Sequence, residues 1–100
     1  METVVAAPAA GNASPVERFV AERAPVWDEL EQLVTQAKNR PSRVGAHGVR
    51  RLGETYRAAA ADLAIARRQY PGSPFIVRLE RLVQRARTAV YHSSRSSGTF

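Results

Sequence analysis

Apolar residues return every three or four positions in three separate stretches of this chain, which is the period of a helix that buries one face. In the first stretch, the apolar positions are Val20, Trp27, Leu30, Val34 and Ala37. Ser14 and Glu17 open this stretch with the spacing of a capping box, which favours a helix start. We therefore predict a helix over residues 15–39. Pro25 removes one backbone donor and crowds the preceding turn, so we expect a kink there or two helices that meet at Ala24.

Two further stretches show the alternating three- and four-residue spacing of a coiled-coil seam. The second stretch carries it at Val49, Leu52, Tyr56, Ala59, Leu63, Ala66 and Tyr70, and the third at Ile76, Leu79, Val83, Ala86 and Val90. These patterns predict helices over residues 47–70 and 74–92. The Pro-Gly-Ser-Pro sequence at 71–74 stops one helix and starts the next, and the glycine-containing residues 41–48 are predicted to form a loop.

The predicted fold class is all-α, an antiparallel three-helix bundle that spans residues 14–92. The second and third helices must be antiparallel neighbours because the connection between them is so short. Each apolar stripe is too narrow to be stable alone, so the first helix is expected to cover the pair. Residues 1–13 are aperiodic and interrupted by proline and glycine, which predicts a disordered lead, and residues 93–100 have the composition of a Ser-rich linker.

Composition narrows the choice of function and limits the size of the core. Of the 44 hydrophobic residues among 100, 17 are alanine, so only 27 are larger apolar side chains. Because the core is so small, the chain could also form a homodimer. The absence of cysteine from the sequence excludes disulfides, thiolate metal sites and thiol nucleophiles. No segment approaches the ~18–20 apolar residues of a membrane span, so the chain alone is expected to be soluble.

Charge is divided unevenly along the chain. Residues 1–37 carry a net charge of −4, and residues 38–100 carry +10. On the third predicted helix, an outward stripe of arginines continues beyond the helix end; its members are Arg78, Arg81, Arg85 and Arg95. Three interpretations stay open: a solvated face, a contact with anionic lipid or an acidic partner, and nucleic-acid binding. The last lacks aromatic residues interleaved with the arginines, whereas a basic stripe near a chain end is typical of sequences just inside a membrane span.

Candidate chemistry is sparse. His47 and His92 have no acidic or histidine partner three or four residues away, which disfavours a metal site on a helix. The serines of the predicted linker have no nearby base to activate them. We therefore predict no enzymatic activity, no cofactor and no small-molecule substrate.

Asp62 is the most informative polar residue of the predicted core. No basic residue lies three or four positions away on its own helix. It is either a solvated carboxylate or one half of a cross-helix pair with an arginine that sets the register of the helices. For such a pair, Asp62→Asn should lower the melting temperature mainly at low salt.

Three blocks of the chain carry a family likeness: FVAERAPVWDELEQLV, RLGETYRAAAADLAIARRQYPGS and VRLERLVQRARTAVYHSS. Positions within them that fit the family pattern include Trp27, Leu52, Tyr56, Asp62, Leu63 and Tyr91. In this order, the blocks resemble the amino-terminal region of the stage II sporulation protein M family, in the branch that is widespread in GC-rich bacteria.

The resemblance implies a helical region at the cytoplasmic face of a polytopic membrane protein, with the membrane spans expected after residue 100. Founding members of the family act in engulfment during sporulation, as a membrane scaffold for cell-wall hydrolases. The implied function is a non-enzymatic docking or assembly module in cell-envelope organisation, with other subunits of a membrane complex and anionic lipid as partners. The alternative is a small basic helical protein that binds nucleic acid.

Overall fold

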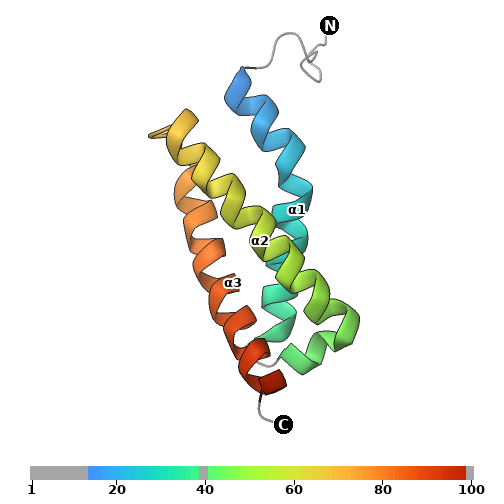
Figure 1. Ribbon diagram of the computed structural model, residues 1–100. Coiled ribbons are helices and arrows are strands. Elements are labelled where there is room, and N and C mark those ends of the chain that lie inside the picture. Colours follow the sequence, from blue (N-terminus) through green and yellow to red (C-terminus); the bar gives the residue numbers. More distant parts are fainter. Residues whose placement is uncertain (1–13, 39–40, 99–100) are drawn as a thin grey trace, which may run out of the picture.

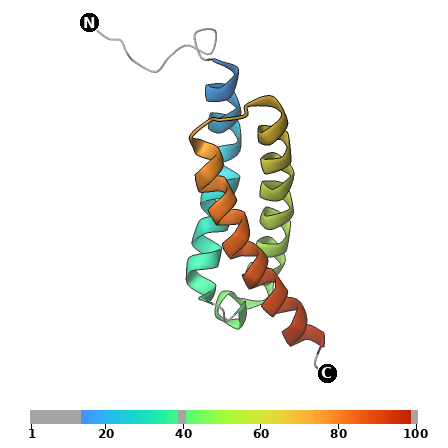
Figure 2. The ribbon, with the colours of Figure 1, turned by 90° about the vertical axis from the view of Figure 1, so that its left-hand side faces the viewer.

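Three long helices and one short 3-10 helix make up the computed structural model, which describes residues 14–38 and 41–98 (Figure 1). They are α1 (Pro15–Ala37), η3 (Pro41–Val44), α2 (Gly45–Gln69) and α3 (Phe75–Gly98). The helix α2 runs antiparallel to both α1 and α3, and all three helix pairs pack against each other (Figures 1 and 2). This arrangement confirms the predicted all-α three-helix bundle. The predicted disordered lead, residues 1–13, lies outside the described residues.

The helix α1 starts where the capping box predicts. The Glu17 backbone N–H donates to Ser14 Oγ at 3.1 Å, and the Ser14 backbone N–H donates to Glu17 Oε1 at 2.9 Å. The helix then continues through Pro25 as one element, so the alternative of two helices that meet at Ala24 is wrong. Pro25 and Ala21, whose carbonyl loses its usual donor, are both exposed, and water can replace the missing bond.

Two helix boundaries differ from those predicted. The segment 41–48 is not a loop: it forms η3 and the first turn of α2, and the positive φ of +76° at Gly45 lets the chain pass from one to the other. The helix α3 continues past the predicted end at residue 92 to Gly98. Serine is only slightly less favourable in a helix than most residues, and adding a turn to a formed helix is easier than starting one.

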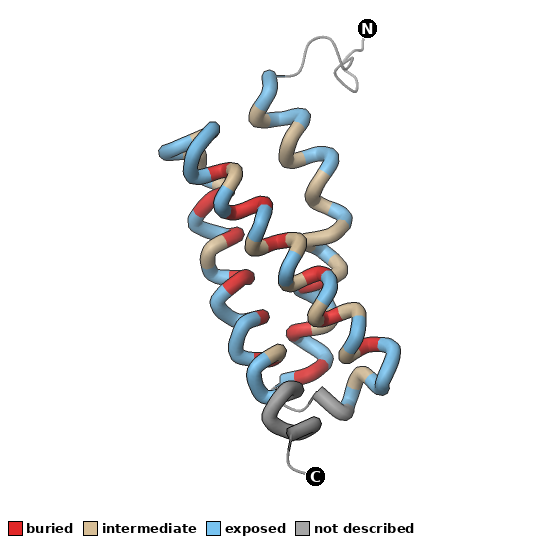
Figure 3. Tube along the Cα trace, in the orientation of Figure 1, coloured by how far each residue is buried: buried red, intermediate tan, exposed pale blue. Residues whose placement is uncertain are grey.

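The core follows the predicted seams (Figure 3). Its buried apolar residues on α2 are Leu52, Ala59, Leu63 and Ala66, those on α3 include Ile76, Leu79, Val83 and Ala86, and those on α1 are Leu30, Val34 and Ala37. A second buried stripe on α2, which the apolar pattern does not reveal, consists of Gly48, Thr55 and Asp62 at seven-residue intervals. The hydroxyl of Thr55 is satisfied within its helix by the Arg51 carbonyl at 2.8 Å.

Ion pairs join the helices outside the core. Arg51 donates from Nε to Glu29 Oε2 at 2.8 Å and from Nη2 to Glu29 Oε1, which ties α2 to α1 with two parallel bonds. Arg67 donates to Glu80 Oε2 at 2.9 Å, which ties α2 to α3. Over the part of the chain that the structure describes, no helix has the length and apolarity needed to cross a membrane.

Candidate docking groove

The carboxylate of Asp62 receives two donors from α1. Arg23 Nε lies 2.8 Å and Trp27 Nε1 lies 2.9 Å from the same oxygen, Oδ2. Asp62 is only 5 % exposed, so the interpretation as a solvated carboxylate is wrong and the predicted cross-helix pair with an arginine is confirmed. Because Arg23 and Trp27 lie one turn apart, the Asp62 network fixes both the register and the rotation of α1 against α2.

Four aromatic side chains gather where the start of α1 meets the turn between α2 and α3. The ring centroid of Phe19 lies 5.3 Å from that of Tyr70 and 6.0 Å from those of Trp27 and Phe75. Trp27 stacks on Phe75 with a centroid distance of 5.7 Å and an interplanar angle of 11°. The pattern of apolar positions does not reveal this aromatic cluster, although the predicted turn at 71–74 places Tyr70 and Phe75 at one end of the bundle.

An open groove of about 280 Å³ lies between α1 and α3, beside the aromatic cluster. Its apolar lining comes from both helices: Val20, Ala24, Trp27, Phe75, Leu79 and Leu82. Charged side chains of opposite sign line the two sides, Asp28 and Glu31 on α1 and Arg78, Arg81 and Arg85 on α3. We call this feature the α1–α3 groove.

Three of the four arginines predicted as a contact surface lie together on the α3 side of this groove. All three are exposed, and their contacts with α1 are long: Arg78 Nη2 lies 3.9 Å from Glu31 Oε1, and Arg85 Nη2 lies 3.4 Å from Thr35 Oγ1. Arg81 makes no hydrogen bond or ion pair with any residue in the described part of the chain. The side chain of Arg95 lies outside the described residues. The arginine face of α3 is therefore largely available for contacts with another molecule.

Most of the remaining residues that fit the family pattern pack in or against the core. Leu52 and Leu63 are buried in the core, and Tyr56 packs against it while partly exposed. Tyr91 is 62 % exposed near the end of α3. Of the family-pattern set, Trp27 and Asp62 are therefore the two that bear directly on the groove.

The two side chains whose pKa values are shifted, Glu29 and Arg51, form an ion pair between α1 and α2. Hydrogen bonds from Arg51 lower the pKa of the Glu29 carboxyl below its ordinary value, against a smaller opposing effect of burial, and the same pairing raises the pKa of Arg51. His47 and His92 are both exposed, on α2 and α3 respectively. Among residues 14–38 and 41–98, no three His, Cys, Asp or Glu side chains come close enough to hold a metal ion.

Residues 17–92 match the profile of a protein family described as domain of unknown function DUF8413. The chain belongs to this family. The matched region contains the Asp62 network, the aromatic cluster and every residue that lines the α1–α3 groove. No curated protein and no solved structure matches the chain.

Proposed function

We propose that this DUF8413 chain is a non-enzymatic helical docking module that binds anionic groups through the arginine face of α3. In this proposal, it is the cytoplasmic module of an integral membrane protein similar to stage II sporulation protein M, and it takes part in organising the cell envelope. The observation that carries the docking function is the row Arg78, Arg81 and Arg85, which is exposed and only loosely paired within the chain.

The division of charge among the helices supports an anionic partner. The residues of α1 carry a net charge of −3, whereas those of α2 and α3 carry +3 and +4. Two carboxylates, Glu29 on α1 and Asp62 in the core of α2, are already engaged in bonds between helices. An arginine near an anionic membrane surface contributes about 1 kcal/mol of attraction, so three of them on one face suffice to select that face.

Vesicle binding tests this proposal. We expect the chain to bind vesicles of phosphatidylcholine mixed with phosphatidylglycerol, to bind phosphatidylcholine alone far less, and to lose binding as salt rises. The combined change Arg78→Gln, Arg81→Gln and Arg85→Gln should weaken binding roughly a hundredfold at low salt, because each arginine supplies about 1 kcal/mol.

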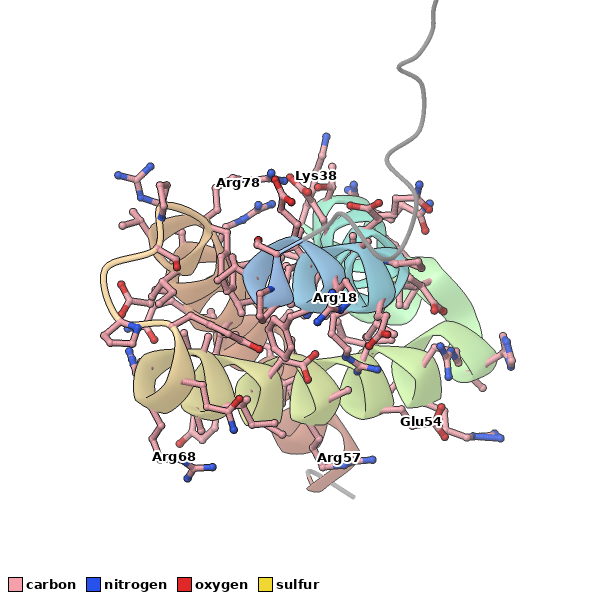
Figure 4. The ribbon with its side chains drawn as sticks, turned by 90° about the horizontal axis from the view of Figure 1, so that it is seen from above. Arg18, Lys38, Glu54, Arg57, Arg68 and Arg78 are labelled. Atoms are coloured by element: carbon pink, nitrogen blue, oxygen red, sulfur yellow. The ribbon has the colours of Figure 1, made fainter. Side chains whose placement is uncertain are left out.

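A matched control removes the same charge from another face. Arg50, Arg57 and Arg68 are exposed on α2 and form no ion pair within the described residues. Seen from above the bundle, Arg57 and Arg68 extend away from the side that carries Arg78 (Figure 4). Their combined change to glutamine should weaken vesicle binding much less, since charges beyond about one Debye length are screened. Equal losses in the two triple variants would contradict a docking face on α3.

Binding to duplex DNA, measured over the same salt series, tests the alternative function. Tight binding with a steep salt slope, together with no vesicle binding, would favour a small basic nucleic-acid-binding protein over the docking module. Within the described residues, Tyr91 is the exposed aromatic side chain nearest in sequence to the α3 arginines, and it alone provides little surface for base stacking.

A further inference from the structure

The floor of the α1–α3 groove is held in place before any partner binds. Trp27 donates its N–H to Asp62 on α2 and stacks on Phe75 at the start of α3, so its ring is fixed from two sides. Asp62 is in turn held by Arg23, and Leu79 and Leu82 belong to the buried core. A partner that inserts an apolar side chain here meets a formed surface and has little ordering of the groove to bring about.

The dimensions of the groove match a short helix. Its lining spans residues 20–31 on α1 and 75–85 on α3, about 15 Å along each helix at ~1.5 Å per residue. This length takes two to three helical turns, whose apolar side chains would enter the groove at positions i, i+4 and i+7. An amphipathic helix is thus the element whose length and side-chain spacing fit the floor.

The charges along the groove determine which orientation and which charged residues of that helix are favourable. The α3 side presents Arg78, Arg81 and Arg85, while the α1 side presents Asp28 and Glu31. A flat anionic membrane could contact the three arginines, but it would leave the apolar floor unfilled and would gain nothing from the two carboxylates. A helix with carboxylates along the edge that faces α3, and neutral or basic residues along the edge that faces α1, meets both sides favourably.

The chain itself does not offer such a helix on its described surface. The large apolar side chains exposed there are Val77 and Tyr91, both on α3 and separated by almost four turns. They cannot form a ridge with anchors at i, i+4 and i+7. The described surface of a second copy is therefore a poor fit to the groove.

We propose that the α1–α3 groove binds an amphipathic helix of a partner protein, with apolar anchors on the groove floor and carboxylates against Arg81 and Arg85. The inference rests on the proposed docking function and names its partner as an acid-edged helix. The Asp62 network then has a second role beyond stability, because it positions Trp27 as part of the binding floor.

A phage-displayed library of single helices tests this inference without knowledge of the natural partner. In the library, the i, i+4 and i+7 positions vary among Leu, Phe, Ala and Ser, and both edges vary among Glu, Gln and Lys. Selection on the folded chain should enrich peptides with large apolar anchors and Glu along one edge. Trp27 is the single tryptophan of the chain, so binding of a synthesised peptide should shift its fluorescence.

Ala24→Gln and Ala21→Gln form a matched pair of variants on α1. Ala24 lines the groove, whereas Ala21 is exposed and is not part of its lining. The glutamine at position 24 should fill the floor and weaken the selected peptide roughly tenfold or more, because about one anchor side chain loses its burial. The glutamine at position 21 should leave the peptide affinity unchanged, and thermal unfolding followed by circular dichroism checks that both variants fold.

A charge exchange gives a second test that does not depend on packing. Arg81→Glu should weaken the Glu-edged peptide roughly fivefold and strengthen a version of the peptide with Lys along that edge. The proposal would be overturned if the library yielded no enriched peptides. It would also be overturned if neither Ala24→Gln nor Arg81→Glu changed the affinity of the selected peptides. Self-association of the chain in sedimentation equilibrium that Ala24→Gln abolishes would overturn it too, since the occupant would then be a second copy.

The vesicle experiment separates this inference from the function on which it rests. Ala24→Gln keeps all three arginines and should bind anionic vesicles as the unchanged chain does. Vesicle binding without peptide enrichment would remove the groove proposal and keep the arginine face. Peptide enrichment without vesicle binding would remove lipid contact and keep the groove as a site for protein partners.

Discussion

Asp62 couples the packing of α1 against α2 to the shape of the groove between α1 and α3. A buried carboxylate without partners is strongly unfavourable, so the two donors from Arg23 and Trp27 are a condition for its presence in the core. The same bonds orient the Trp27 ring, one face of which stacks on Phe75. A change at Asp62 should therefore alter both stability and the binding floor.

We expect Asp62→Asn to lower the free energy of unfolding by about 1–3 kcal/mol, because an amide oxygen keeps an acceptor for Trp27 but loses the charge that holds Arg23. Salt should change this loss little, in contrast to the expectation from sequence of an effect mainly at low salt. Asp62 is 5 % exposed, and a buried pair is screened less than a surface pair. Urea unfolding at low salt and at about 1 M salt measures both quantities.

The control for this variant is Asp28→Asn, which removes the same charge from an exposed position on α1. It should change stability by less than about 0.5 kcal/mol. Equal effects of the two variants, or a loss at Asp62 that vanishes in high salt, would show that the buried pair contributes no more than surface charge.

Glu29 should make stability depend on pH in the acid range. Its pKa in the folded chain lies below the ordinary value of 4.5, because Arg51 donates two hydrogen bonds to the ionised form. The resulting stabilisation is fully present above the ordinary value and is lost as the pH falls through the lower, folded-state value. Both side chains are more than a third exposed, so the contribution is modest.

Glu29→Gln measures this contribution directly. The variant should unfold at a lower temperature than the unchanged chain at neutral pH. The difference should shrink as the pH falls below the ordinary value of 4.5 and should be gone once the pH is below the lowered, folded-state pKa of Glu29. Glu22→Gln, at an exposed position without a hydrogen bond or ion pair in the described structure, should show no such convergence. A difference at Glu29 that stays constant with pH would mean that ionisation of the carboxylate is not its source.

At the scale of the helices, periodicity predicted the buried faces because burying one face of a helix requires apolar residues every three or four positions. The alternating three and four spacing identified the seams of α2 and α3, and the capping box at Ser14 identified the start of α1. The buried stripe of Gly48, Thr55 and Asp62 was not predicted because its members are small or polar, and a pattern of apolar residues does not include them. The start of α2 at Gly45 was not predicted because it depends on a left-handed backbone conformation, which composition alone does not reveal.

Two glycines should respond in opposite ways to the same substitution. Gly53 lies within α2, where Gly→Ala gains about 0.5–1 kcal/mol by restricting the unfolded chain, and the added Cβ meets only the flexible end of Arg57 at 3.3 Å. Gly72 has φ of +84° in the turn before α3, where a Cβ costs about 1–2 kcal/mol. Thermal unfolding should place Gly53→Ala above the unchanged chain and Gly72→Ala below it. Stabilisation by both variants would mean that the turn is not held in its left-handed conformation.

At the scale of the whole molecule, the sequence predicts the arginine stripe but not the groove that the arginines line. Spacing along α3 placed Arg78, Arg81 and Arg85 on one face, since that requires only the helical period. The opposing Asp28 and Glu31, and the floor between them, depend on how α1 rotates against α3. That rotation is fixed by the Asp62 network and the aromatic cluster, which join residues as much as 56 positions apart (Phe19 and Phe75).

The alanines explain how a chain with few large apolar residues forms a packed bundle. Ala37, Ala59, Ala66 and Ala86 are completely buried, one or two on each helix, and small side chains at these levels let the helices approach closely. The ion pairs Glu29–Arg51 and Arg67–Glu80 then join neighbouring helices at the surface. The core therefore depends on the absence of bulk at particular positions as much as on the apolar area it buries.

A pair of Ala→Leu variants on α2 tests this dependence. Ala66 is completely buried and Ala64 is exposed, so the same added side chain meets either the core or solvent. Ala66→Leu should lose about 1–3 kcal/mol despite its greater hydrophobicity, because the helices must separate to admit it, and this corresponds to a fall of several degrees or more in melting temperature. Ala64→Leu should change stability by less than about 0.5 kcal/mol. If Ala66→Leu were instead as stable as the unchanged chain or more so, the space between the helices would not be filled, and close approach through alanine would not be what holds the bundle together.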